Sequence, residues 1–232
     1  MHGAHRVGTP RWMEVKKSLS PDATGGKNIW KPRAGALYSL RRKIAPPRNA
    51  MSQRLQVEQW IPVPLPKVFA FFSDPHNLPR IMPPSQGAKI VKLNLVPPRF
   101  AEGKRPPDIE RMAGAGTEIT FKFRAIPHVP IHERWTALIT EFAFNEYFSD
   151  IQKQGPFNSW HHTHSFGAKV VDGREGTVVG DEVEYEVGFG VVGMLLETLI
   201  FQRMMRSTFE HRKKALEMVF AAEIEESRLA RK

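Results

Sequence analysis

Residues 177–187 read TVVGDEVEYEV and residues 193–220 read GMLLETLIFQRMMRSTFEHRKKALEMVF, and these two stretches decide the fold. In the first, glutamates at every second position alternate with Asp181, Val183 and Tyr185, which predicts a strand with one face in water and the other inward. In the second, apolar residues recur at helical spacing. The sequence therefore predicts a strand, a glycine-rich turn and one helix of about 25 to 30 residues.

Period-two alternation recurs towards the N-terminus and predicts the remaining strands. The segments are Leu55–Ile61, Lys89–Val96, Thr117–Arg124, Glu133–Glu141, Phe144–Gln152 and Ser159–Val170. Two short helical segments bounded by prolines, Lys67–Phe72 and Leu78–Met82, follow the first strand. No parallel crossover unit is indicated. The pattern predicts an α+β fold in which an antiparallel sheet of about six to seven strands closes over the C-terminal helix.

The positive charge of the chain is concentrated near its N-terminus. The formal charge is +10, and residues 1–50 hold 11 basic and 2 acidic groups, which leaves 23 and 22 for the remainder. Because the predicted folded part has no basic excess, a nucleic-acid-binding domain is not indicated. Residues 1–50 are rich in Pro, Gly, Lys and Arg, and we expect this extension to be disordered.

Three explanations of this extension stay open. It is a solvated arm or a tether to an anionic surface, or it is a transit peptide, because it contains Arg and few acidic groups. Alternatively, translation starts at Met51, which opens the predicted folded part. We expect residues 51–222 to form the domain and residues 223–232 to form a charged tail.

Composition also bears on location and partners. The chain has no cysteine, so it has neither disulfides nor thiolate metal ligands, and we expect a cytoplasmic location. The most apolar run, Val187–Phe201, is too short to span a bilayer and contains Glu197. We therefore expect neither integral membrane association nor a nucleic-acid partner.

Three motifs in these segments resemble a known family. They are YFSDIQKQGPF at residues 147–157, WHHTHSF at residues 160–166, and Asp181 with Tyr185 before the glycine-rich turn. Together they resemble a bacterial branch of the SRPBCC ligand-binding proteins of the polyketide cyclase/dehydrase-like type. These share the START-like helix-grip fold of START lipid-transfer domains and the birch pollen allergen. The resemblance covers Gln53–Phe220 and implies a deep cavity between sheet and helix that holds a hydrophobic ligand. It implies no particular reaction, because the superfamily mixes carriers, sensors and enzymes.

The inward faces of the predicted strands combine aromatic and polar side chains. The polar ones are Asp150, Gln152, His162, His164 and Asp181. An apolar pocket with a few convergent polar groups is the usual form of a small-molecule site. We therefore predict contacts with a hydrophobic ligand from Gln152 and from Phe121, Phe123, Trp135, Phe148, Trp160, Phe166, Tyr185, Leu199 and Met205.

His162 and His164 lie two positions apart on one predicted strand, so their rings point the same way. In one interpretation they hydrogen-bond Asp150 or Asp181 and stiffen the sheet. In a second, they anchor a carbonyl, hydroxyl or carboxylate of the ligand. In a third, one imidazole, oriented by Asp181 or Asp150, is the general base of an aldol-type cyclisation or a dehydration.

A metal site is a fourth interpretation. His162, His164 and Asp150 could supply three nitrogen and oxygen ligands and leave an open position. However, that pairing depends on strand register, and His161 belongs to the opposite face. We therefore expect no metal and no cofactor.

The leading functional hypothesis is a non-enzymatic binder or carrier of a hydrophobic small molecule such as a lipid, an isoprenoid, a polyketide or an aromatic compound. One alternative is a cofactor-independent cyclase or dehydratase, and another is a regulatory interaction module. The basic positions of the helix are expected to form its solvated face: Arg203, Arg206, Arg212, Lys213 and Lys214.

Overall fold

The computed structural model describes residues 52–100, 105–124, 132–187 and 202–229. The chain divides into two compact units, Met1–Arg33 and Ala34–Lys232, and every described residue belongs to the second. The predicted extension and the predicted ligand contact Leu199 therefore lie outside the described residues.

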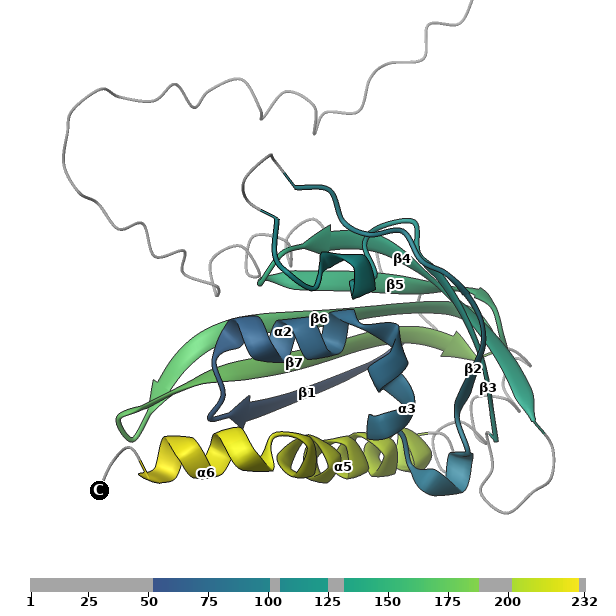
Figure 1. Cartoon of the computed structure of the whole chain (residues 1–232). Coiled ribbons are helices and arrows are strands. Elements are labelled where there is room, and N and C mark those ends of the chain that lie inside the picture. The colour runs from purple at the N-terminus through teal and green to yellow at the C-terminus, as the bar shows by residue number, and fades with distance from the viewer. Residues whose placement is uncertain (1–51, 101–104, 125–131, 188–201, 230–232) are drawn as a thin grey trace, which may run out of the picture. The chain divides into compact units, whose positions relative to one another are not determined.

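A single antiparallel sheet of seven strands forms the body of this unit (Figure 1). Its strand order is β1-β7-β6-β5-β4-β3-β2. Shifts of register between β4 and β5 interrupt the regular ladder, and such bulges increase the bend of a sheet. The strands are β1 (Gln53–Ile61), β2 (Lys89–Asn94), β3 (Glu118–Phe123), β4 (Glu133–Ala143), β5 (Tyr147–Gln154), β6 (Phe157–Val171) and β7 (Arg174–Val187).

Short helices fill the connection between β1 and β2. Proline stands in the first turn of both α2 (Leu65–Ser73) and α3 (Leu78–Ile81), where its missing N–H costs no hydrogen bond. Short 3₁₀ helices complete the connections: η2 (Pro75–Asn77), η3 (Pro84–Gln86) and η4 (Ile109–Arg111). The predicted pair of short helical segments after the first strand is confirmed.

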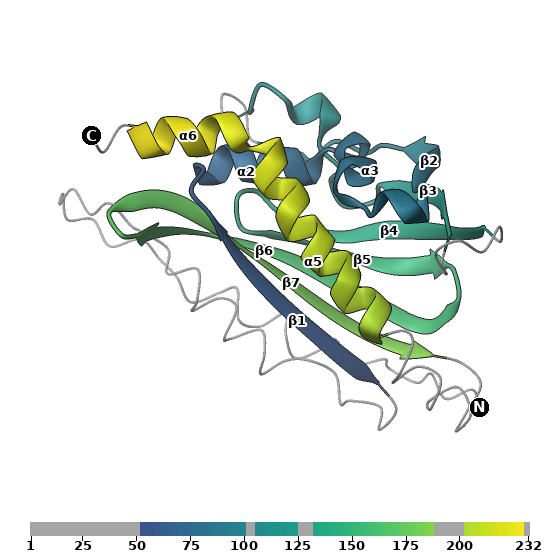
Figure 2. The same ribbon diagram turned by 90° about the horizontal axis from the view of Figure 1, so that it is seen from below.

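The C-terminal part of the unit is helical. α5 (Gln202–Val219) crosses one face of the sheet, and α6 (Ala221–Leu229) continues from it at an angle (Figure 2). The Gln59 side-chain amide donates to the Lys213 carbonyl at 3.2 Å and ties β1 to α5. The described part of the predicted helix is α5, which ends beside Phe220, and α6 lies mostly in residues 223–232, which were predicted to be a charged tail.

The two faces of β7 divide as the sequence predicts. Asp181, Val183 and Tyr185 are buried, whereas Glu182 and Glu184 are only half-buried and pair with Arg54 on β1. The core side of the sheet centres on Phe69 of α2, which is fully buried. Its ring packs edge to face against the rings of Phe142, Phe144, Phe148 and Phe166. The predicted helix-grip fold is confirmed.

Candidate functional site

Strand register brings four of the five predicted polar residues together. Asp150 on β5 lies directly opposite His162 on β6, and His164 on β6 lies directly opposite Asp181 on β7. All four side chains therefore project from the same face of three neighbouring strands. Each residue is buried, with 7–8% of its surface exposed. We call these residues, together with Arg212, the polar cluster.

Asp181 is the centre of the polar cluster. Its Oδ1 accepts hydrogen bonds from Nε2 of His162 at 3.0 Å and from Nη1 of Arg212 at 2.7 Å. Nδ1 of His164 lies 2.8 Å from the same oxygen. One carboxylate oxygen thus contacts three nitrogen-bearing side chains.

Arg212 corrects the expectation that the basic residues of the helix all face water. It is only 7% exposed and reaches from α5 to the sheet. Position 212 lies three residues after Phe209 and four before Leu216, both buried, so it belongs to the apolar stripe of α5. That spacing indicates in the sequence that Arg212 is a buried position. The adjacent Lys213 and Lys214 instead favoured the interpretation of the whole segment as a solvated basic face.

Burial and charge set the protonation of the polar cluster. Burial alone would raise the pKa of Asp181, but the Arg212 guanidinium and the two imidazoles hold it well below its usual range. Burial lowers the pKa of His162 and of His164, so both rings are neutral near neutral pH. Burial also raises the pKa of Asp150, and His162 offsets only part of this effect.

Aromatic rings surround the polar cluster. The ring centroid of His164 lies 4.6 Å from that of Phe148 and 5.7 Å from that of Phe72. The ring of His162 lies 6.0 Å from Trp160 and 6.3 Å from Phe209. The sequence did not identify Phe72 and Phe209 as site residues, although both stand at helical positions that face the sheet.

The other predicted ligand contacts fall into three groups. Phe148 and Phe166 belong to the main core around Phe69. Phe121, Phe123, Trp135 and Trp160 form a second aromatic group, in which the rings of Trp135 and Trp160 lie 4.6 Å apart. Tyr185 and Met205 pack with Val183 and Phe209 beneath α5.

Gln152 does not join the polar cluster. Its side-chain amide donates to the Phe157 carbonyl at 2.8 Å, and its oxygen accepts from the Phe157 N–H at 3.2 Å. A Cβ on Gly155 would lie 2.3 Å from Gln152 Oε1, so the side chain folds over a turn that only glycine leaves open. Gln152 therefore closes the β5–β6 hairpin.

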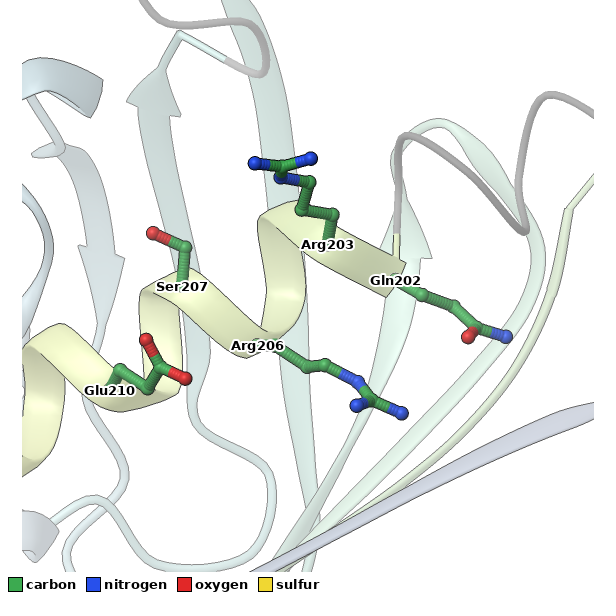
Figure 3. Close-up of a pocket in the computed structure, with 5 residues that line it drawn as sticks. All are labelled: Gln202, Arg203, Arg206, Ser207 and Glu210. Atoms are coloured by element: carbon green, nitrogen blue, oxygen red, sulfur yellow. The ribbon is translucent and has the colours of Figure 1, made fainter.

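Two hollows adjoin the N-terminal half of α5. The larger, of about 520 Å³, is open and is lined by side chains of α5 alone (Figure 3), namely Gln202, Arg203, Arg206, Ser207 and Glu210. The smaller, of about 50 Å³, lies between α5, β1 and β7 and includes two predicted ligand contacts, Tyr185 and Met205. Typical small-molecule pockets measure about 300–1,000 Å³. Neither hollow is lined by the polar cluster.

Comparison with known families decides the membership of this chain. The family described as "Polyketide cyclase / dehydrase and lipid transport" matches residues 61–214. The chain belongs to this family. The match runs from the last residue of β1 into α5 and so contains the whole polar cluster. Family membership and fold together suggest binding or transport of a hydrophobic molecule.

Several solved structures are similar to this family member. TTHA0849 from Thermus thermophilus is 21% identical with a TM-score of 0.47, and the alignment covers 73% of this chain and 99% of that one. Ms6760 from Mycobacterium smegmatis is 15% identical with a TM-score of 0.47 and coverage of 73% and 92%. Ginseng major latex-like protein 151 from Panax ginseng is 12% identical with a TM-score of 0.48 and coverage of 73% and 97%.

A comparison with curated proteins gave no match. Among the helices that the structure describes, none has the length and apolar composition required to cross a membrane.

Proposed function

We propose that this protein binds or carries a small hydrophobic molecule that bears at least one hydrogen-bond acceptor oxygen, and that the molecule lies between the sheet and α5. The family description, which names lipid transport beside polyketide cyclisation, supports this class of ligand. The aromatic rings beneath and beside α5 provide the apolar contact area that such a ligand requires.

One observation carries the proposal: Nε of Arg212 is buried and has no hydrogen-bond partner among the described residues. A buried donor without an acceptor costs about 1–3 kcal/mol, so native proteins usually supply a partner. A carbonyl, hydroxyl or carboxylate oxygen of a ligand would satisfy the Arg212 Nε–H. The aromatic neighbours Phe148 and Phe209 would then contact its apolar part.

Native mass spectrometry of protein purified without detergent tests the proposal, followed by organic extraction of whatever is bound. We expect a stoichiometric adduct that is soluble in organic solvent and contains oxygen. Arg212→Met should lower adduct occupancy, whereas Lys214→Met on the exposed side of α5 should not. An adduct-free wild-type protein that also fails to bind an added panel of fatty acids, isoprenoids and aromatic ketones would refute it.

The geometry of His164 and Asp181 favours a second candidate function, a cofactor-independent cyclase or dehydratase. A neutral imidazole with a carboxylate 2.8 Å from one ring nitrogen is a suitable general base. In this case fresh protein should convert the extracted ligand, with loss of one water for a dehydration, or with a changed chromatographic retention at unchanged mass for a cyclisation. His164→Ala should abolish that conversion and change ligand affinity by less than about tenfold. Binding without conversion would leave the carrier function alone.

A further inference from the structure

Asp150, His162 and His164 form a compact set of donor atoms. Each offers one atom, a carboxylate oxygen or a ring nitrogen, and the three atoms lie within 4.8 Å of one another. Bonds from zinc to nitrogen or oxygen are about 2.0–2.2 Å long, so a shift of about 1 Å would bring all three donors onto one ion. The strands fix this arrangement, because Asp150 and His162 are a directly opposed pair and His164 follows on the same face of β6.

The orientation of His162 suits a metal ligand. Its Nε2 is hydrogen-bonded to Asp181 Oδ1 at 3.0 Å, whereas its Nδ1 faces Asp150 Oδ2 at 3.6 Å, which is too long for a hydrogen bond. A hydrogen bond from one ring nitrogen to a carboxylate fixes the tautomer and leaves the lone pair of the other nitrogen for a metal. Asp181 is itself held by Arg212. The second carboxylate of the polar cluster is therefore placed to orient a ligand.

The charges of the polar cluster favour a cation beside Asp150. The single guanidinium, on Arg212, is bonded to Asp181. Within the described residues no Lys or Arg lies in ion-pair range of Asp150, and its nearest ionisable partner is the His162 ring. A buried carboxylate stays ionised only where a counter-charge or a metal offsets its burial. The position between Asp150 and the two imidazoles is where such a charge would be neutralised.

We propose that Asp150, His162 and His164 bind one divalent first-row transition metal ion, with Asp181 and Arg212 as the groups that position His162. Two imidazoles and one carboxylate favour zinc or iron(II) over magnesium or calcium, which prefer oxygen ligands alone. Three protein ligands leave at least one coordination position open. That position would face the aromatic rings around His164. The inference goes beyond the proposed function, because ligand binding by hydrogen bonds does not require a metal.

Zinc titration of the full-length, EDTA-treated protein by isothermal calorimetry tests the metal site. We expect one Zn²⁺ per chain, and loss of that binding in His162→Ala and His164→Ala. Asp181→Asn should retain binding but weaken it by about 10–100-fold, the usual effect of removing a group that orients a ligand. His161→Ala, which removes a neighbouring histidine from the opposite face of β6, should bind like the wild type. A double His2→Ala/His5→Ala variant controls for the two histidines near the N-terminus and should also bind normally.

Cobalt(II) locates the ion in the wild-type protein without any substitution. Because Co²⁺ is paramagnetic, it should broaden or shift the amide NMR signals of Ile151 and Thr163, which neighbour the proposed ligands in sequence, and leave those of α6 unchanged. Absence of stoichiometric Zn²⁺ binding, its loss in the His2/His5 variant, or Co²⁺ effects confined to residues outside β5 and β6 would each overturn the site. Extraction of the hydrophobic ligand from EDTA-treated protein tests the proposed function without the metal, so failure of the metal site and failure of ligand binding can be distinguished.

Discussion

The Arg212 guanidinium on α5 and the Asp181 carboxylate on β7 form a buried ion pair, with 2.7 Å between Nη1 and Oδ1. It joins the helix to the sheet in an interior that is otherwise largely apolar. Removing one partner of such a pair leaves an uncompensated buried charge, which costs about 3–5 kcal/mol. We therefore expect Arg212→Ala to lower the free energy of unfolding by about this amount in urea denaturation.

Two further variants separate charge from packing in this pair. Lys214→Ala, on the exposed side of the same helix, should change the unfolding free energy by less than about 0.5 kcal/mol. Replacing both partners with apolar residues, as in Arg212→Met with Asp181→Leu, should cost less than Arg212→Ala alone. If the double variant is less stable than Arg212→Ala, the attraction within the ion pair stabilises the folded protein by more than the desolvation of its two charges destabilises it.

Asp74 predicts a dependence of stability on acid pH. Its carboxylate accepts from the His76 N–H at 3.0 Å and from Arg111 Nε at 2.8 Å. Burial opposes ionisation, but the hydrogen bond with the His76 ring, together with those from the His76 N–H and Arg111, holds the pKa of Asp74 below its usual value of 3.8. Because the folded pKa is the lower one, the stabilisation is complete above the unfolded pKa and is lost as pH falls through the folded pKa.

Substitution of Asp74 should therefore lower the stability of the protein at neutral pH but not in strong acid. We expect Asp74→Asn to lower the melting temperature at pH 7 and the difference from the wild type to shrink below pH 4. Asp108→Asn is the matched control, because Asp108 is exposed and its side chain caps no helix. A difference between Asp74→Asn and the wild type that stays constant from pH 7 to pH 3 would contradict the assignment.

Phe69 is the residue on which the aromatic core depends most. It is fully buried, and its ring centroid lies 5.1–6.3 Å from those of four other phenylalanines. We expect Phe69→Ala to destabilise the protein by about 3–5 kcal/mol in chemical denaturation, because the substitution leaves a cavity among these four rings. Val91→Ala removes an apolar side chain that is 50% exposed and should have almost no effect. If Phe69→Ala lowers the free energy of unfolding as little as Val91→Ala does, the core tolerates the cavity.

Much of the sheet could be predicted from the sequence, because one wet and one buried face impose a period of two. Asp181 and Tyr185 were expected inside and their glutamate neighbours on the other face, and in the structure the first two are buried while Glu182 and Glu184 are half-buried. The same alternation placed His162, His164 and Asp150 on one inward face. It could not show that Asp150 faces His162, because pairing across strands depends on register, which turns and bulges set.

The helix and the turns were less predictable, for two physical reasons. Arg212 belongs to the apolar stripe by position, but a long cationic side chain is normally found in water, and its burial depends on the partner Asp181, which is distant in the sequence. Gln152 follows the inward alternation, but the adjacent turn offers its amide two backbone partners. In both cases a contact distant from the local pattern decided the orientation of the side chain.

Gly114 supports a final prediction, about the segment between β2 and β3. Its N–H donates to the Val96 carbonyl at 2.9 Å, and a Cβ at this position would lie 2.7 Å from the Pro98 nitrogen and 2.8 Å from Pro98 Cα. These are backbone atoms, so they cannot rotate away as a flexible side chain would. Overpacking of this kind costs about 1–3 kcal/mol, and we expect Gly114→Ala to lower the unfolding free energy by that amount.

Gly173 provides the matched control for this substitution. It has φ of +71°, and no atom lies within 4 Å of a Cβ built there, so Gly173→Asn should have little effect because Asn tolerates positive φ. Gly114 has no such requirement for positive φ, and its glycine is needed for space alone. Thermal unfolding of the two variants separates the causes. If Gly114→Ala melts with the wild type, the chain around Pro98 must be able to move away from residue 114. Residue 114 itself is less free to move, because the N–H of the neighbouring Ala113 is bonded to the Ser73 carbonyl of α2.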